Sequence, residues 1–134
     1  MTMKLVATLS LGLAVMVFMA AAPALGHHSF AAEFDSKQPV KLTGTVTKVE
    51  WTNPHVWFYI DVKDDTGKVA NWAMEMGGTT GLLRAGWRRD SMKIGDVVTV
   101  DGFRARNGKT IGNATAIVLT STGQRLFAAS SQQQ

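Results

Sequence analysis

Two adjacent histidines, His27 and His28, have the clearest capacity for metal chemistry in this sequence. They follow a long apolar run, and the chain contains one other histidine, His55, in the segment WTNPHVW. If His27 begins the mature protein, its α-amino group and imidazole Nδ1 can chelate one metal ion together, because an α-amine with a pKa of about 7.7–8.0 loses its proton readily to a metal. His28 or His55 would complete a three-nitrogen site, which suits Cu(II). The opposing interpretation is that the pair is simply solvated and that His55 finishes a turn.

A second candidate group lies in the segment NWAMEM, where Trp72, Met74 and Met76 alternate and therefore share one face of a strand. Thioethers are soft ligands that select Cu(I) or Ag(I), and a tryptophan ring can cover a bound cation. The alternative is that this face belongs to the core, because methionine fills irregular gaps well. The sequence alone does not decide which face of this strand points inward.

Trp57 and Tyr59 fall on the face of the segment VWFYIDV opposite its apolar residues. Aromatic side chains exposed on a sheet can stack sugars or bases, so these two and Trp72 form a candidate ligand-binding surface. Alternatively, the aromatic residues that precede Val40 pack over Trp57 and Tyr59. That packing would also bring His27 and His28 towards the sheet.

Catalysis has little support in this sequence, and we do not expect an enzyme. The chain has no cysteine, its serines lie in no nucleophile motif, and it has no glycine-rich phosphate loop. The absence of cysteine also excludes disulfides, thiolate metal sites and a lipid-modified cysteine. The net charge of +4 is too mild to indicate nucleic-acid binding. The partners that we expect are a copper ion, a small ligand or another protein of the cell envelope.

Residues 1–26 show the three-part pattern of a secretory signal peptide, with Lys4 before an apolar run and small residues after it. The segment AAAPALG allows cleavage before Leu25 or before His27, and we expect the cut before His27. The alternative is an uncleaved membrane anchor, because the apolar run is nearly long enough to span a bilayer. We therefore expect a periplasmic monomer that has no membrane contact after cleavage.

Strand patterns dominate the remainder of the chain. We expect a leader over 27–39, one domain over 40–128 and a disordered tail over 129–134. The alternation of apolar residues slips between Val46 and Val49, which indicates a bulge. The expected strands cover 40–51, 56–62, 69–76, 97–104 and 111–119, and a short helix covers 81–89. Three strands, a helix and two strands are the order of the OB-fold, so we predict an all-β, five-stranded Greek-key barrel.

Three segments carry a resemblance to a known family. HHSFAAEFD, GTVTKVEWTNPH and GDVVTVDGF resemble a family of small exported bacterial proteins whose function is uncharacterised. The resemblance covers essentially the whole chain after the expected signal peptide. It implies export and one compact β domain, and it implies no particular activity.

A weaker resemblance concerns residues 71–118. The segments NWAMEM and MKIGDVVTV are similar to the periplasmic Cu(I)/Ag(I) metallochaperones of Cus-type efflux systems, small OB-fold proteins that bind the ion with two methionines, a histidine and a tryptophan. The resemblance implies Met74 and Met76 as the methionine pair and Trp72 as the tryptophan. One residue separates Trp72 from Met74 where that family has two, which puts the tryptophan cap in doubt. The histidine has no clear counterpart, and His55 is the nearest candidate.

Overall fold

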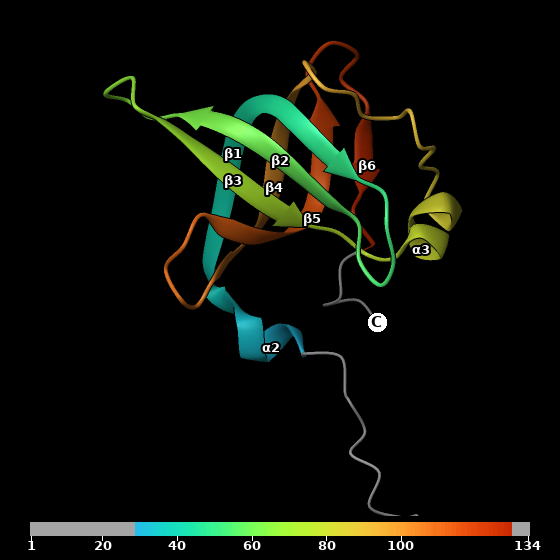
Figure 1. Cartoon of the computed structure of the whole chain (residues 1–134), viewed down its shortest axis with the longest axis horizontal. Helices are drawn as coiled ribbons and strands as arrows, with labels where there is room; N and C mark the ends of the chain where they lie inside the picture. The colour runs from blue at the N-terminus through green and yellow to red at the C-terminus, as the bar shows by residue number, and fades with distance from the viewer. Residues whose placement is uncertain (1–28, 130–134) are drawn as a thin grey trace, which may run out of the picture.

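The computed structural model describes residues 29–129, which form six strands and two short helices (Figure 1). The expected signal peptide, His27, His28 and the end of the expected tail lie outside these residues. None of the described helices is long and apolar enough to cross a membrane. The elements are α2 (Phe30–Glu33), β1 (Phe34–Glu50), β2 (Trp57–Lys63), β3 (Val69–Glu75), α3 (Thr79–Arg84), β4 (Val97–Ala105), β5 (Ile111–Leu119) and β6 (Arg125–Phe127).

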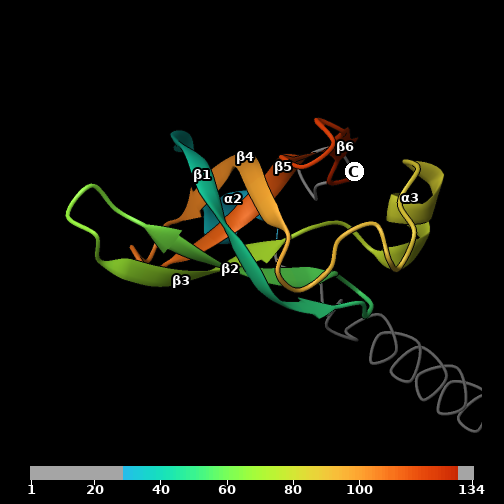
Figure 2. The ribbon, with the colours of Figure 1, turned by 90° about the horizontal axis from the view of Figure 1, so that it is seen from above.

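The strands close into a barrel through pairings at both edges of the sheet. β1 pairs antiparallel with both β2 and β4, β2 pairs with β3, and β4 pairs with β5. β3 and β5 then pair in parallel from Ala73↔Ile111 to Glu75↔Asn113, which completes the ring of five strands. This connectivity is that of the OB-fold, and the predicted fold class is confirmed. Figure 2 shows α3 to one side of this ring.

β1 is longer than the sequence pattern indicates, because it begins at Phe34 and not at Val40. Phe34 pairs with Ala105 of β4, and after an irregularity the pairing resumes at Pro39↔Phe103. The side chain of Phe34 is only 2% exposed, so burial of this ring ties the expected leader to the barrel. The predicted bulge is confirmed by the shift in register between Val46 and Lys48.

The core occupies the inside of the barrel. Each strand alternates between this interior and the outer surface, and the interior side chains are nearly all inaccessible to solvent. α3 covers one side of the barrel with Leu82, and the turn after it adds Trp87. The main contributors from the strands are Val46, Phe58, Ile60, Trp72, Met74, Val98, Val100, Ala114 and Ile117.

β6 is a strand that sequence analysis did not predict. It spans only three residues, too few to show a period, yet it pairs with β5 from Ala116↔Phe127 to Val118↔Arg125. It brings Leu126 into the core, and the carbonyl of Phe127 accepts a hydrogen bond of 2.8 Å from the indole Nε1 of Trp87.

α3 begins at Thr79, and its cap comes from a distant residue. Asn53 Oδ1, in the loop before β2, accepts hydrogen bonds from the Thr79 backbone N (3.1 Å) and from its Oγ1 (3.0 Å). The helix ends at Arg84, earlier than predicted, because Gly86 takes a φ of 96°, the left-handed conformation that terminates helices.

Candidate functional site

A buried polar cluster lies where β3 and β5 meet. The alternation of β3 points Met74 inward, so Glu75 lies on the opposite face, and the register places Glu75 beside Asn113 of β5. The Asn113 Nδ2 donates a hydrogen bond of 3.3 Å to Glu75 Oε1, and His55 Nδ1 lies 3.5 Å from the same oxygen. Glu75 is 3% exposed and Asn113 is fully buried. A carboxylate buried this deeply requires such partners to offset its loss of hydration.

His55 is fixed in this position by the backbone on both sides of it. Thr52 Oγ1 donates a hydrogen bond to the His55 carbonyl, and the next residue, Val56, exchanges backbone hydrogen bonds with Gly77 and Met76. The side chain of His55 is 23% exposed, so the ring lies at the boundary between the buried carboxylate and solvent. A carboxylate beside one ring nitrogen orients an imidazole and leaves the other nitrogen for a metal or a proton.

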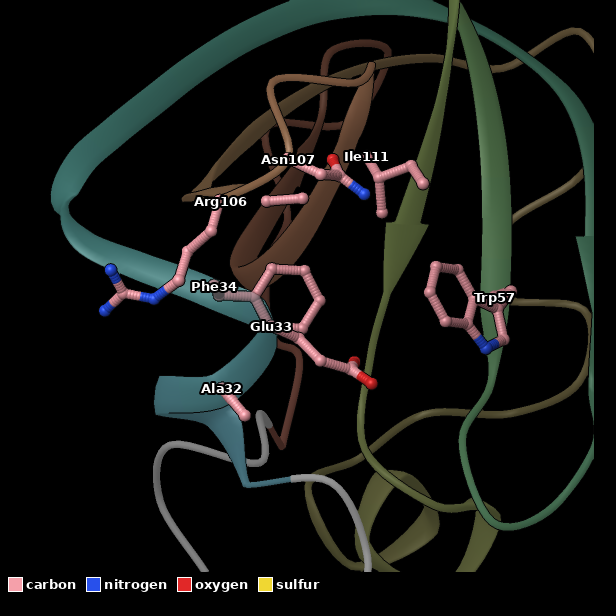
Figure 3. A pocket seen from close by; sticks show the side chains of 8 residues that line it. Ala32, Glu33, Phe34, Trp57, Arg106, Asn107 and Ile111 are labelled. Atoms are coloured by element: carbon pink, nitrogen blue, oxygen red, sulfur yellow. The ribbon is translucent and has the colours of Figure 1, made fainter.

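A cavity of about 470 Å³ lies next to this cluster, between α2 and the barrel (Figure 3). Trp57 of β2, which lines it, is the register partner of Glu75, so the cavity and the cluster share the β2–β3 region of the barrel. The volume falls in the range typical of sites for small molecules. The lining residues are Ala32, Glu33, Phe34, Trp57, Ala105, Arg106, Asn107 and Ile111.

α2 is held against the barrel by aromatic and polar contacts. The ring of Phe30 stacks on Phe34 with centroids 5.6 Å apart and meets Phe103 edge-on at 5.7 Å. Arg106, just after β4, donates from its backbone N to the Glu33 carbonyl (2.9 Å) and from Nε to the Ala31 carbonyl (2.8 Å). These contacts fix the position at which the chain that follows His27 and His28 joins the barrel.

Trp57 and Tyr59, which sequence analysis grouped together, have different surroundings. Trp57 is half-buried and lines the cavity. The Tyr59 hydroxyl instead donates a hydrogen bond of 2.9 Å to Glu50 Oε2, and Lys48, which is ion-paired with Glu50, lies 5.2 Å from the Tyr59 ring. The hydrogen bond to Glu50 raises the pKa of Tyr59. Lys48 makes the largest contribution to lowering the pKa of Glu50, and the hydrogen bond from Tyr59 makes the second largest. The Tyr59 hydroxyl is thus committed to a neighbouring carboxylate, and Tyr59 is not among the residues that line the cavity.

Of the other predicted site residues, some lie in the core and the rest lie outside the residues that the structure describes. Met74 and Met76 are fully buried and Trp72 is 8% exposed, so all three side chains belong to the core. The guanidinium of Arg104 lies 5.3 Å from the Trp72 ring. His27 and His28 lie outside the described residues, and the structure does not place them relative to His55.

Within residues 29–129, no three side chains of histidine, cysteine, aspartate or glutamate are grouped so that they could hold a metal ion. This part of the chain offers His55, with Glu75 behind it, as a partial donor set. Further nitrogen ligands would have to come from His27 and His28.

Sequence analysis missed three residues of this region: Glu33, Glu75 and Asn113. Glu75 lies between Met74 and Met76 in the segment NWAMEM, and Asn113 lies near the start of the segment IGNATAIVL. The predicted fold contained a usable signal, because the OB topology places strands three and five side by side. This adjacency brings polar residues of the two strands close together, Glu75 and Asn113 among them.

A family model matches residues 14–114. The chain belongs to DUF6152, a family of unknown function. The DUF6152 match agrees with the resemblance to an uncharacterised family, and it includes His27, His28, His55, Glu75 and Asn113. None of the curated proteins compared with the chain matches it.

Proposed function

We propose that this protein is exported to the periplasm, where it binds or delivers copper at a site formed by His55 and the segment that begins at His27. The observation that carries this proposal is the contact of 3.5 Å between His55 Nδ1 and the buried Glu75 Oε1, which Asn113 also contacts. A histidine that ligates a metal usually has a carboxylate or carbonyl at its other ring nitrogen, which fixes the ring and raises its basicity. His55 therefore has the surroundings of a metal ligand.

The entry point of the N-terminal segment supports the same site. α2 starts at Phe30, and its residues Ala32 and Glu33 line one cavity together with Trp57, which follows His55 by two residues. His27 precedes Ser29 by two residues, a reach of roughly 7 Å in an extended chain. α2, which follows Ser29, therefore lies beside the start of β2, the strand that His55 precedes by two residues.

A thioether site at Met74 and Met76, as in the Cus-type metallochaperones, is the variant of this proposal. Both side chains are fully buried, so an ion could reach them only if the barrel opened. Opening the barrel would break the hydrogen bonds that close β3 on β5, whereas His55 already borders solvent. The site that uses His55 is therefore the better supported of the two.

The proposal is tested on protein exported from cells, with its first residue determined by intact mass in the presence and absence of copper. We expect a chain that starts at His27 and retains one copper ion. Cu(II) affinity, measured by competition titration, should fall by about 100-fold in His27→Ala and in a variant with one residue added before His27. His55→Ala and Glu75→Gln should lower it by about 10- to 100-fold, the range found for residues that orient metal ligands.

His28→Ala is the control that separates the two possible third ligands. If His55 completes the site, His28→Ala should retain most of the affinity, and circular dichroism should show that all variants remain folded. Unchanged Cu(II) affinity in both His27 variants would end the proposal. A mature chain that starts at Leu25 would also end it, because its α-amine would then belong to another residue.

A second candidate function is the binding of a small ligand, a glycan or an envelope protein without a metal. The observation that favours a small ligand is the cavity of about 470 Å³ with the half-buried Trp57 in its wall. Trp57→Ala should then abolish binding while the domain stays folded. A large loss of stability in this variant would instead assign Trp57 to the core.

A further inference from the structure

We infer that the basic segment, residues 83–94, adsorbs to the surface of a membrane that contains anionic phospholipids. The segment runs from the end of α3 towards β4 and takes no part in either proposed function. Two observations that coincide in this segment carry the inference: positive charge that the fold does not neutralise, and exposed aliphatic side chains.

The excess positive charge of the described chain is concentrated in the basic segment. The sequence has 14 lysines and arginines, of which Lys4 lies outside residues 29–129 and four lie in the segment, so nine remain. It has 10 aspartates and glutamates, of which Asp90 lies in the segment, so nine remain here as well. With histidine neutral, the rest of the described chain therefore has balanced side-chain charges, whereas the basic segment carries a net charge of +3. Its cationic residues are Arg84, Arg88, Arg89 and Lys93.

Two buried side chains fasten the basic segment to the barrel. Trp87 and Met92 are nearly inaccessible to solvent, and the Trp87 indole donates its hydrogen bond to the Phe127 carbonyl. Between them, the Arg88 backbone N donates to Ser91 Oγ at 2.8 Å, and the Ser91 backbone N donates to the Arg88 carbonyl at 3.0 Å, which closes a turn. All four cationic residues of the segment are exposed. Figures 1 and 2 show α3 and the chain after it, coloured yellow to orange, on the outside of the barrel.

The cations of the basic segment have no carboxylate partner within residues 29–129. The side chains of Arg84, Arg89 and Lys93 form no ion pair in this part of the chain, and Arg88 Nη1 donates only to a backbone carbonyl, at 3.1 Å. Asp96, just after the segment, accepts its hydrogen bond of 2.8 Å from the backbone N of Lys93 and not from the ammonium group. Elsewhere, four cations are paired with carboxylates: Lys41, Lys48, Arg106 and Arg125.

Aliphatic side chains on both sides of the cations favour a lipid surface over an acidic protein. Leu83 precedes the first cation and Ile94 follows the last, and Ile94, at 72%, is the most exposed large apolar side chain of the described chain. Such side chains enter the boundary between headgroups and acyl chains, while guanidinium and ammonium groups bind the phosphates. Protein interfaces are typically enriched in aromatic side chains, but the one aromatic residue of the basic segment, Trp87, is buried.

The contact that we infer is peripheral. A surface of cations and aliphatic side chains lies on a bilayer and needs no helix that crosses it. This inference differs from the expectation, drawn from the sequence, of no membrane contact after signal cleavage. The difference arises because the fold holds the excess charge apart from a remainder whose charges balance.

The experiment measures how the protein exported from cells partitions onto sedimented vesicles of phosphatidylcholine, with and without about one third phosphatidylglycerol. We expect the parent to bind the anionic vesicles, to bind the neutral ones only weakly, and to be released as the salt concentration rises. Each cation near an anionic leaflet strengthens adsorption about fivefold, so Arg84→Gln/Arg89→Gln/Lys93→Gln should bind the anionic vesicles about 100-fold more weakly. These three side chains make no contact that folding requires, and circular dichroism should show the variant folded.

Lys37→Gln/Lys68→Gln/Lys109→Gln is the matched control, because it removes the same charge from exposed residues outside the basic segment. It should weaken binding by less than about fivefold. Leu83→Ser/Ile94→Ser should weaken binding to the anionic vesicles about tenfold, because the aliphatic contact with the acyl chains is lost. The same variant should bind soluble poly-L-glutamate as the parent does, since its cations are unchanged.

Three outcomes would overturn the inference. Equal losses in the two charge variants would show that net charge, and not the basic segment, governs adsorption. Equal binding of the parent to neutral and anionic vesicles would remove the role of the cations. A parent that binds poly-L-glutamate but not the anionic vesicles would assign the surface to an acidic protein instead of a membrane.

Discussion

Gly77 has no room for a side chain. Its backbone N donates a hydrogen bond of 2.8 Å to the Ala128 carbonyl, and a Cβ at this position would lie 2.0 Å from the Ala129 carbonyl oxygen. A backbone atom cannot turn aside as a flexible side chain can, so relief would require the segment after β6 to move. We predict that Gly77→Ala lowers the free energy of unfolding by about 3 kcal/mol, the upper end of the usual cost of overpacking.

Gly81→Ala is the control for this substitution. Its Cβ would lie 3.5 Å from the Ala129 Cβ, an ordinary contact, and Gly81 is inside α3, where alanine is the better helix former. Urea unfolding should show this variant equal to the parent or more stable by up to about 1 kcal/mol. Equal stability of the Gly77 and Gly81 variants would mean that the contact with Ala129 does not constrain the fold.

At the scale of single residues, the sequence showed which side chains could bind a metal or a ligand, but not which way those side chains point in the fold. Met74 and Glu75 are neighbours, and only the closure of the barrel decides that the thioether is enclosed and the carboxylate meets Asn113 and His55. Trp57 and Tyr59 share a face by alternation, yet the partners of each ring come from different elements. No local pattern indicates those partners.

The turn between β2 and β3 is held by one carboxylate. Asp64 Oδ1 accepts hydrogen bonds from the Thr66 backbone N (2.9 Å), from the Thr66 Oγ1 (2.6 Å) and from the Lys68 backbone N (3.0 Å). These hydrogen bonds hold the pKa of Asp64 below its ordinary value of 3.8, and the bond from the Thr66 hydroxyl lowers it most. The ionised form is therefore favoured in the folded state over the unfolded state.

This shift predicts a dependence of stability on pH. A lowered folded-state pKa contributes stability that is fully present above about pH 4 and is lost as the pH falls through the lowered pKa. The melting temperature of Asp64→Asn should therefore lie below that of the parent at pH 6, and the two should converge at about pH 2. Asp65→Asn, in the same turn but without these hydrogen bonds, should match the parent at both values. A gap for Asp64→Asn that persists at pH 2 would contradict this explanation.

At the scale of elements, the strongly periodic segments were predictable and the ends were not. β2, β4 and β5 follow their apolar alternation to within a residue or two of the predicted bounds. β1 starts earlier because burial of Phe34 outweighs the irregular polar stretch between it and Pro39. β6 forms because its backbone pairs with β5. This pairing depends on the tertiary structure, so the sequence of three residues does not indicate it.

The molecule as a whole depends on its last strand. Leu126 and Ala128 belong to the core, and the Phe127 carbonyl satisfies the Trp87 indole N. We predict that removal of residues 125–134 abolishes cooperative thermal unfolding, because it opens the core and leaves a buried donor without a partner. Removal of 130–134 alone should leave the melting temperature unchanged, and circular dichroism during heating distinguishes the two. A truncated protein that still melts cooperatively would show that β6 is dispensable.

The dependence of the core on residues as late as Ala128 also governs when this barrel can fold. A chain synthesised or secreted N-terminus first presents β1 early, but β1 needs β4, and β3 must wait for β5 before the ring closes. Contacts between segments so distant in sequence make folding slow compared with that of helical proteins. The barrel therefore cannot close until nearly all of the polypeptide has emerged, a property that would suit the proposed export of an unfolded chain.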